Sequence, residues 1–343
     1  MPSRKTETTE LSVGFGLLGY SNPFEPPFSE IFSKFQGSLS IEKHKLYLSE
    51  YPKNQNLYPI MLNVGLNLRK TFPLFNNLQT LRWLGPERQA STTSTARDLQ
   101  AVNVPISVKA KSNVVGNPSP YNLFISTPQG SGLAKGTRSW YLESALSDYQ
   151  SFYNLAKEIT GLDKLPSSVE EFERLGNKKL LINAIKNIST SDIFEFQNLY
   201  IKMCHQSAKE AADTFNDNLS HSLNSPVKGS VLERIAKMFF RMNAVEYILC
   251  GIDGQNEFAV KIPDLTTWLQ NWEFKAIQAA PDFERKQSVV NFSIDIQNKK
   301  HLKSYNVIFH AEIRWSHGKF SSVEGKLYKE FNWVDLPFFT QIF

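Results

Sequence analysis

The stretch ARDLQAVNVPISVKAK, residues 96–111, predicts a β-hairpin on which the rest of the fold can be built. Apolar and polar side chains alternate along its second arm, as in a strand with one buried face. The apolar positions are Val104, Ile106, Val108 and Ala110, and the polar ones are Ser107, Lys109 and Lys111. Two short antiparallel arms would bring Asp98 on the first arm beside Ser107 and Lys109. The hairpin is therefore expected to present a carboxylate, a hydroxyl and an amine together.

This hairpin lies in a basic window, residues 51–142. The window holds ten Lys and Arg but only two acidic residues, Glu87 and Asp98, so its formal charge is +8. The remaining residues hold 28 basic and 31 acidic side chains, a formal charge of −3. A positive region that keeps one well-placed carboxylate suggests a polyanionic substrate and a metal ion.

Composition indicates a globular protein of the cytoplasm. The chain has 343 residues, 41% of them hydrophobic, and no apolar run of the roughly 18 residues that a membrane span needs. Residues 1–20 carry two Glu before their apolar part, so we interpret them as mature protein rather than a signal peptide. Two cysteines without CxxC spacing exclude a zinc-finger framework and fit a reducing compartment.

The chain changes character near residue 226. Before it, apolar spacing predicts helices over 57–71, 140–160, 167–189, 191–223 and 229–242. An irregular arm is expected at 21–37, and residues 112–139 are expected to be mostly loop. After residue 243, β-branched and aromatic runs predict strands at 244–250, 257–262, 287–296, 304–315 and 323–334, with one helix at 263–271. We therefore expect two regions, 1–225 and 226–343, of which the second is either a separate domain or extra strands of the first.

Asp98 and Lys109 have the chemistry that phosphodiester hydrolysis requires. The reaction needs a metal ion to stabilise charge on the scissile phosphate, an attacking water and often a cation beside them. A carboxylate such as Asp98 binds Mg²⁺ through oxygen. Lys109 could orient the water or stabilise the pentavalent phosphate.

These residues resemble the PD-(D/E)xK nuclease superfamily, and within it the type II restriction endonucleases. Asp98 matches the family's first acid and Lys109 its lysine, while Ser107 takes the place of the usual second acid. The segments AKSNVVGNPSPYNLF (110–124) and, more weakly, AEIRWSHGKF (311–320) add to the likeness.

The resemblance implies an α/β (α+β) protein with a mixed sheet flanked by helices, a restriction-endonuclease-like core with extra C-terminal strands. It implies a Mg²⁺-dependent type II restriction endonuclease that cuts double-stranded DNA. A cognate DNA methyltransferase would then be a genetic partner, and a homodimer is compatible with this reading. Region 1–225 would hold the core, and region 226–343 a DNA-recognition extension.

The departure at Ser107 leaves the second metal-binding carboxylate open. Glu87 is the only acid upstream within the basic window, and Glu143 is the first acid downstream of Asp98. Glu87 is slightly favoured. Contacts to DNA are expected from the loop 112–138 and from two further groups of side chains: Arg97, Lys111 and Asn113 near the hairpin, and Arg314, His317 and Lys319 near the C-terminus.

Simpler interpretations stand beside these. Asp98 could merely cap the hairpin, because Asp is common in turns, and Lys109 could be a solvated strand lysine. The cluster at 314–319 could be a polar turn between strands. The rival function is a non-catalytic DNA-binding protein or a degenerate nuclease partner. A Ser/His/Asp triad is disfavoured because the basic window contains no His.

Overall fold

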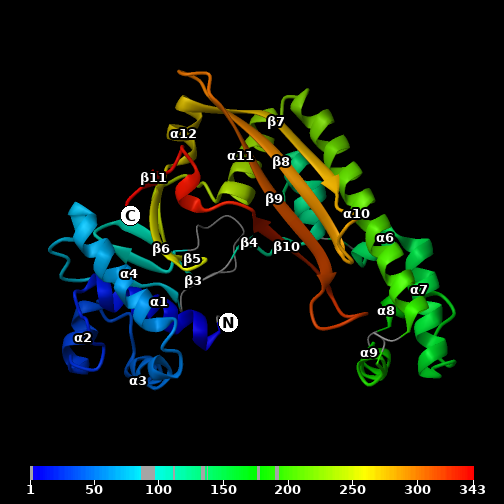
Figure 1. Cartoon of the computed structure of the whole chain (residues 1–343), viewed down its shortest axis with the longest axis horizontal. Helices are drawn as coiled ribbons and strands as arrows, with labels where there is room; N and C mark the ends of the chain where they lie inside the picture. The colour runs from blue at the N-terminus through cyan, green and yellow to red at the C-terminus, as the bar shows by residue number, and fades with distance from the viewer. Residues whose placement is uncertain are drawn as a thin grey trace. The chain divides into compact units, whose positions relative to one another are not determined.

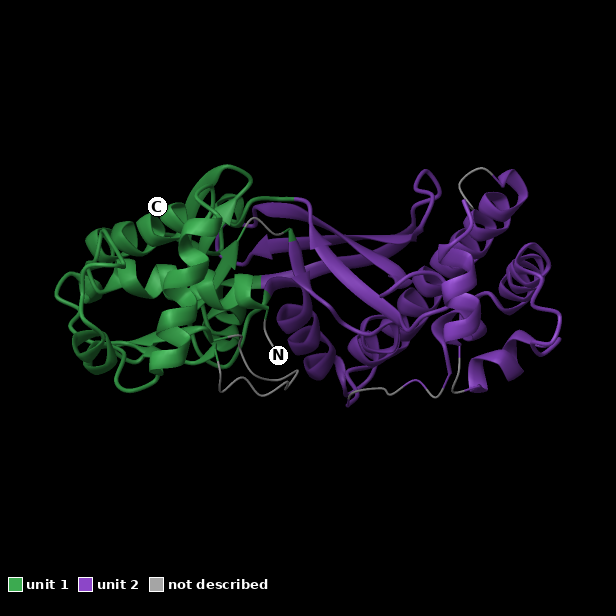
Figure 2. Cartoon of the chain, turned by 90° about the horizontal axis from the view of Figure 1, so that it is seen from below, with its two compact units in different colours: residues 1–113, 241–272, 331–343 green, residues 114–240, 273–330 purple. Residues whose placement is uncertain are grey.

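The computed structural model describes residues 3–85, 97–110, 113–132, 136, 138–175, 178–189 and 193–343. The chain forms two compact units (Figure 2). Unit 1 comprises residues 1–113, 241–272 and 331–343, and unit 2 comprises residues 114–240 and 273–330. The sequence suggested one division near residue 226, whereas both units are discontinuous. The reason lies in strand pairing, because strands before and after the long 114–240 segment join one sheet.

Unit 1 is built on a six-stranded mixed sheet with the order β1-β2-β3-β5-β6-β11. β3 and β5 run parallel and the other neighbouring pairs antiparallel. The strands are β1 Arg82–Trp83, β2 Leu99–Ala101, β3 Val104–Ala110, β5 Tyr247–Asp253, β6 Asn256–Ile262 and β11 Thr340–Gln341. The prediction of a mixed α/β protein is confirmed at this level.

The predicted hairpin is present as β2 and β3, with Leu99 opposite Ile106 and Ala101 opposite Val104. Its two-residue turn places Val102 and Asn103 at φ values of 48° and 67°. Such left-handed pairs match the twist of antiparallel strands. Asn tolerates this conformation, but a β-branched Val does so at a cost, so the pairing of the arms must hold the turn.

The first four helices of unit 1, α1 to α4, cover the sheet face that carries Ile106 and Val108. α1 and α4 touch backbone to backbone, because a Cβ added at Gly16 would lie 2.1 Å from the Leu62 carbonyl oxygen. α4 confirms the helix predicted at 57–71. The helices are α1 Arg4–Leu17, α2 Phe28–Lys34, α3 Ile41–Glu50, α4 Tyr58–Thr71 and α12 Leu265–Asn271, with short turns η1 Tyr51–Lys53, η2 Pro73–Phe75 and η6 Trp333–Asp335.

Unit 2 is built on a five-stranded antiparallel sheet with the order β4-β10-β9-β8-β7. Its strands are β4 Val114–Gly116, β7 Trp272–Pro281, β8 Ser288–Asn298, β9 Ser304–Trp315 and β10 Val323–Lys329. β7, an edge strand that begins at the last residue of a unit 1 segment, was not predicted. Most of its side chains are exposed or half-buried, so it lacks the apolar run of a core strand.

Helices pack on one face of this second sheet, with α10 lying along β8 (Figure 1). Phe292 of β8 meets Phe215 of α10 and Phe239 of α11 in edge-on ring contacts at 5.1 and 5.0 Å. The helices are α5 Thr127–Gln129, α6 Trp140–Ser144, α7 Leu146–Thr160, α8 Val169–Arg174, α9 Lys179–Lys186, α10 Phe194–Leu223 and α11 Lys228–Phe240, with a π-helical turn η4 Asn122–Ser126.

Three predictions for this part of the chain need correction. The helix predicted at 167–189 is divided into α8 and α9, because α8 ends at Arg174 and Leu175 has an extended backbone. The helix predicted at 140–160 is divided into α6 and α7, because Ala145 adopts φ −153° and ψ 41° between them. The segment 112–139, predicted as loop, contains β4, η4 and α5. Among the helices of the described ranges, none is both long and apolar enough to cross a membrane.

Candidate functional site

Asp98 lies directly before β2 and is only 3% exposed. Its Oδ2 accepts the backbone N–H of Val108 at 2.6 Å and faces the Ser107 hydroxyl at 3.4 Å. Its own backbone joins two neighbours: its N–H donates to Ile106, and its carbonyl accepts from Leu84, both at 2.9 Å. The sheet therefore fixes both the main chain and the carboxylate of Asp98.

The charge of the Asp98 carboxylate also helps raise the pKa values of two buried side chains of β5, Cys250 and Tyr247. Burial raises the pKa of the Cys250 thiol, and the negative charge of Asp98 raises it further. Burial likewise raises the pKa of Tyr247, with an opposing effect from the Arg241 guanidinium and a smaller rise from Asp98. Asp98 thus brings a charge into a poorly solvated part of unit 1.

Ser107 and Lys109 lie on the same face of β3, as alternation predicted. Ser107 is fully buried, and Lys109 is half-buried. Across the parallel pairing, Lys109 faces Gly251 of β5. A Cβ at Gly251 would lie 1.7 Å from the Lys109 carbonyl oxygen, and Gly251 has a φ of 151°. Glycine is therefore required where β5 approaches the strand that carries Lys109.

The second carboxylate remains a prediction. Glu87 lies outside the described residues. Glu143 is exposed on α6 of unit 2, where its charge, after the effect of burial, helps raise the pKa of Tyr121 to about 12. No group of three or more His, Cys, Asp or Glu in the described ranges is arranged to hold a metal ion.

Two acidic residues that the sequence analysis did not select lie in the same unit as the hairpin. Glu10 of α1 is 1% exposed, and its Oε2 accepts the Trp83 indole N–H at 3.0 Å. Trp83 pairs with Leu99, the residue after Asp98. Asp253 ends β5, two residues beyond Gly251, and its Oδ2 accepts the Trp333 N–H at 3.4 Å. In the sequence, Glu10 follows the polar residues 6–9 and directly precedes the apolar part of the N-terminal segment, so no pattern distinguished it.

Of the three residues near the hairpin that are predicted to contact DNA, the structure describes two. Arg97 and Asn113 are exposed side chains of unit 1. Lys111 lies outside the described residues. Because both side chains are exposed, they are accessible to a polyanion.

The C-terminal residues predicted to contact DNA have different surroundings in unit 2. Arg314 of β9 pairs with Glu324 at 3.2 Å and Glu312 at 3.8 Å, so its charge is already compensated. The Lys319 amine lies over the Tyr200 ring, 4.8 Å from its centroid, and burial lowers its pKa. His317 is exposed in the β9–β10 turn. Of the three, only His317 points to solvent without such packing.

No family model, no curated protein and no solved structure matches this chain. The candidate site is therefore described by its own residues: Asp98, Ser107 and Lys109 on the β2–β3 hairpin.

Proposed function

We propose that this protein is a Mg²⁺-dependent endonuclease of the type II restriction class, which hydrolyses phosphodiester bonds of double-stranded DNA in the cytoplasm. The observation that carries the proposal is the hairpin geometry. Asp98 Oδ2 lies 3.4 Å from the Ser107 hydroxyl, and Lys109 follows on the same strand face. A mixed sheet flanked by helices agrees with the restriction-endonuclease-like core that the sequence resemblance implies.

The chemistry of the donors fits Mg²⁺. This ion prefers oxygen ligands and is usually held by one or two carboxylates, with waters and substrate phosphates completing its shell. Asp98 Oδ2 accepts hydrogen bonds, and the two oxygens of a carboxylate together have about four lone-pair positions. When bound, Mg²⁺ would stabilise negative charge on the scissile phosphate.

Three residues of the hairpin would then have separate roles in the reaction. Asp98 would hold the metal at a fixed place, because the Val108 N–H orients its carboxylate. Lys109 would hold the attacking water or stabilise charge on the phosphate. Ser107, which is buried beside Asp98, would support that carboxylate rather than act as a nucleophile.

For the second carboxylate, Glu87 is still the sequence-based candidate, and Glu10 joins it. Glu10 is buried next to the strand that precedes Asp98, and a Cβ at Gly85 would lie 2.8 Å from its Oε2. Its hydrogen bond to Trp83 would hold it in one orientation. A Glu10→Gln variant that cuts as fast as wild type would remove it from the candidates.

The second candidate function is DNA binding without catalysis. Two observations favour it: Asp98 makes the contacts of a hairpin cap, and the described residues contain no group of three metal-ligating side chains. In this case Ser107 would mark a site that has lost its second acid.

Incubation with phage DNA, in Mg²⁺ or EDTA, separates the two functions on a gel. Discrete bands that need Mg²⁺ support the restriction endonuclease. Smearing indicates a non-specific nuclease, and a mobility shift without cutting supports the DNA-binding alternative. An intact substrate and no shift in either buffer would overturn both.

A further inference from the structure

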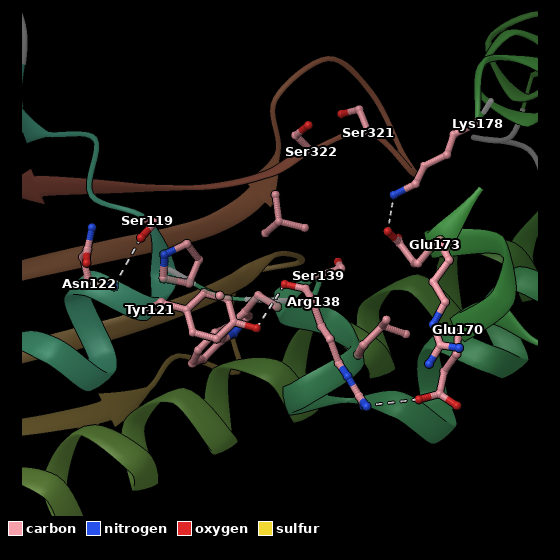
Figure 3. Close-up of a pocket in the computed structure, with 16 residues that line it drawn as sticks. Ser119, Tyr121, Asn122, Arg138, Ser139, Glu170, Glu173, Lys178, Ser321 and Ser322 are labelled. Carbon is pink, nitrogen blue, oxygen red and sulfur yellow. Dashed lines mark hydrogen bonds and ion pairs between the residues drawn. The ribbon is translucent and has the colours of Figure 1, made fainter. Parts of the chain in front are cut away.

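Unit 2 contains a pocket of about 820 Å³ (Figure 3). Its lining comes from four places in the sequence. These are the start of η4, α6 with the residues before it, α8 with the segment after it, and the turn that leads into β10. Its volume falls within the roughly 300–1,000 Å³ typical of small-molecule sites. None of its lining residues belongs to the hairpin that carries Asp98.

Three buried polar atoms in this lining have no hydrogen-bond partner among the described residues. They are Nε1 of Trp140, Oγ of Ser139 and Oδ1 of Asn122. Trp140 as a whole is only 3% exposed. Buried polar groups are nearly always paired, because leaving them unpaired costs stability. The three comprise a donor, an acceptor and a hydroxyl that can do either. They are covered within the pocket wall, so a ligand with adjacent donors and acceptors would satisfy them once a small side-chain movement exposes them.

Positive charge gathers on the other side of the lining. Figure 3 shows Arg138 paired with Glu170, at 3.4 Å, and Lys178 paired with Glu173. Arg174, exposed at the end of α8, adds a third cation against these two carboxylates. The excess of one positive charge suits a single anionic group, and guanidinium groups bind phosphate well.

We propose that this pocket binds one nucleotide, with its base at Trp140, Ser139 and Asn122 and its phosphate at Arg138 and Arg174. Base edges offer donors and acceptors side by side, and the half-buried ring of Tyr121 offers aromatic surface for a planar ligand. The nucleotide is either free or extruded from a DNA strand, as in enzymes that flip a base out of the helix. The inference uses neither Asp98 nor Lys109, so it is independent of the proposed nuclease activity.

Calorimetric titration of the full chain in EDTA tests the pocket. The probes are the four deoxynucleoside monophosphates, their nucleosides and inorganic phosphate. We expect at least one nucleotide to bind with a dissociation constant below about 1 mM and its nucleoside to bind at least about tenfold more weakly. Arg174→Ala should abolish that preference for the nucleotide.

Trp140→Phe removes the unpaired indole N–H and keeps an aromatic ring. It should weaken nucleotide binding about tenfold, the effect of losing one hydrogen bond to a buried group. Trp315→Phe is the matched control, since Trp315 is also buried in unit 2 with an unpaired Nε1 but does not line the pocket. Ser139→Ala provides a second test if the Trp140 variant unfolds.

The inference is overturned if none of the four nucleotides binds, or if Trp140→Phe and Ser139→Ala both bind as tightly as Trp315→Phe. The source of the nucleotide follows from competition with duplex DNA in EDTA. Displacement of bound nucleotide from wild type indicates a base extruded from DNA, and retention indicates a free nucleotide. These titrations are made in EDTA, so they measure nucleotide binding without DNA cleavage. Cleavage in Mg²⁺ is measured in a separate assay, and its absence would count against the nuclease proposal but not against the nucleotide pocket.

Discussion

Asp98 has two roles that a substitution can separate. It caps the Val108 N–H within the hairpin, and it is the proposed metal ligand. Asn at this position keeps an acceptor for the N–H but removes the negative charge, whereas Ala removes both. The free energy of unfolding therefore measures the hydrogen bond to the Val108 N–H, and the cleavage rate measures the contribution of the negative charge.

We expect Asp98→Ala to lower the free energy of unfolding by about 1–3 kcal/mol, because a buried N–H loses its acceptor. Asp98→Asn should lose less stability but reduce cleavage at least about 10³-fold, comparable to the loss of one preorganised electrostatic group. Urea unfolding and a DNA-cutting assay in Mg²⁺ measure the two effects. An Asn variant that cuts at the wild-type rate would leave Asp98 as a hairpin cap only.

Lys109 should affect cutting without affecting binding. Lys109→Ala removes a cation that acts on the reacting phosphate, so cleavage should also fall at least about 10³-fold while DNA binding in Ca²⁺ is largely kept. Lys70→Ala is the control, because Lys70 is an exposed lysine of the same basic window. Equal cutting by the Lys109 and Lys70 variants would contradict the proposed mechanism.

At the scale of elements, the junction of β3 and β5 depends on one glycine. Gly251→Ala would place a Cβ 1.7 Å from the Lys109 carbonyl oxygen, a contact that only a shift of the strands relieves. We expect a loss of more than about 2 kcal/mol in urea unfolding, as for strained positions generally. Gly254→Ala is the comparison: Gly254 has a φ of 62° but nothing within 4 Å, so it should cost only about 1 kcal/mol.

The contact between α1 and α4 gives a second test at this scale. A Cβ at Gly65 would lie 2.2 Å from the Val13 carbonyl oxygen, whereas a Cβ at Gly229 of α11 meets no atom of the described residues within 4 Å. Gly65→Ala should therefore lower the melting temperature. Gly229→Ala should leave it unchanged or raise it slightly, because Ala favours helix by up to about 1 kcal/mol over Gly. Similar shifts in both variants would argue against close packing of the two helices.

At the scale of the whole molecule, the basic window should dominate the affinity for DNA. Lys and Arg that neutralise phosphates release counterions, so affinity should fall by about 10³-fold or more between about 50 and 200 mM salt if six or more contacts form. Arg97→Ala should reduce the salt slope by about 1, whereas Lys300→Ala, an exposed lysine beyond the window, should not. Gel-shift titrations in Ca²⁺ measure the slope. Unchanging affinity over this range would contradict a surface that binds backbone phosphates.

The sequence by itself determined the local elements with strong periodicity. Alternation over 104–110 predicted β3 and placed Ser107 and Lys109 on one face, and spacing by four predicted α4. Both signals arise from contacts within a few residues, so no distant partner is needed to recognise them. α1 was not predicted from the sequence. It is buried from Glu7 to Leu17, so its sequence lacks the alternation of polar and apolar faces by which a helix is recognised.

Only the tertiary structure decided how distant segments pair. β3 joins β5, which lies more than a hundred residues later, so the 114–240 segment of unit 2 is inserted between two neighbouring strands of unit 1. The other segment of unit 2, 273–330, is inserted between two later segments of unit 1. The tertiary structure also decided how polar side chains are paired. Arg314 pairs with Glu324, and the Lys319 amine lies over the Tyr200 ring, while their contact with DNA stays a prediction. Such pairings depend on side chains that only the fold brings together, which is why charge and spacing along the chain could not reveal them.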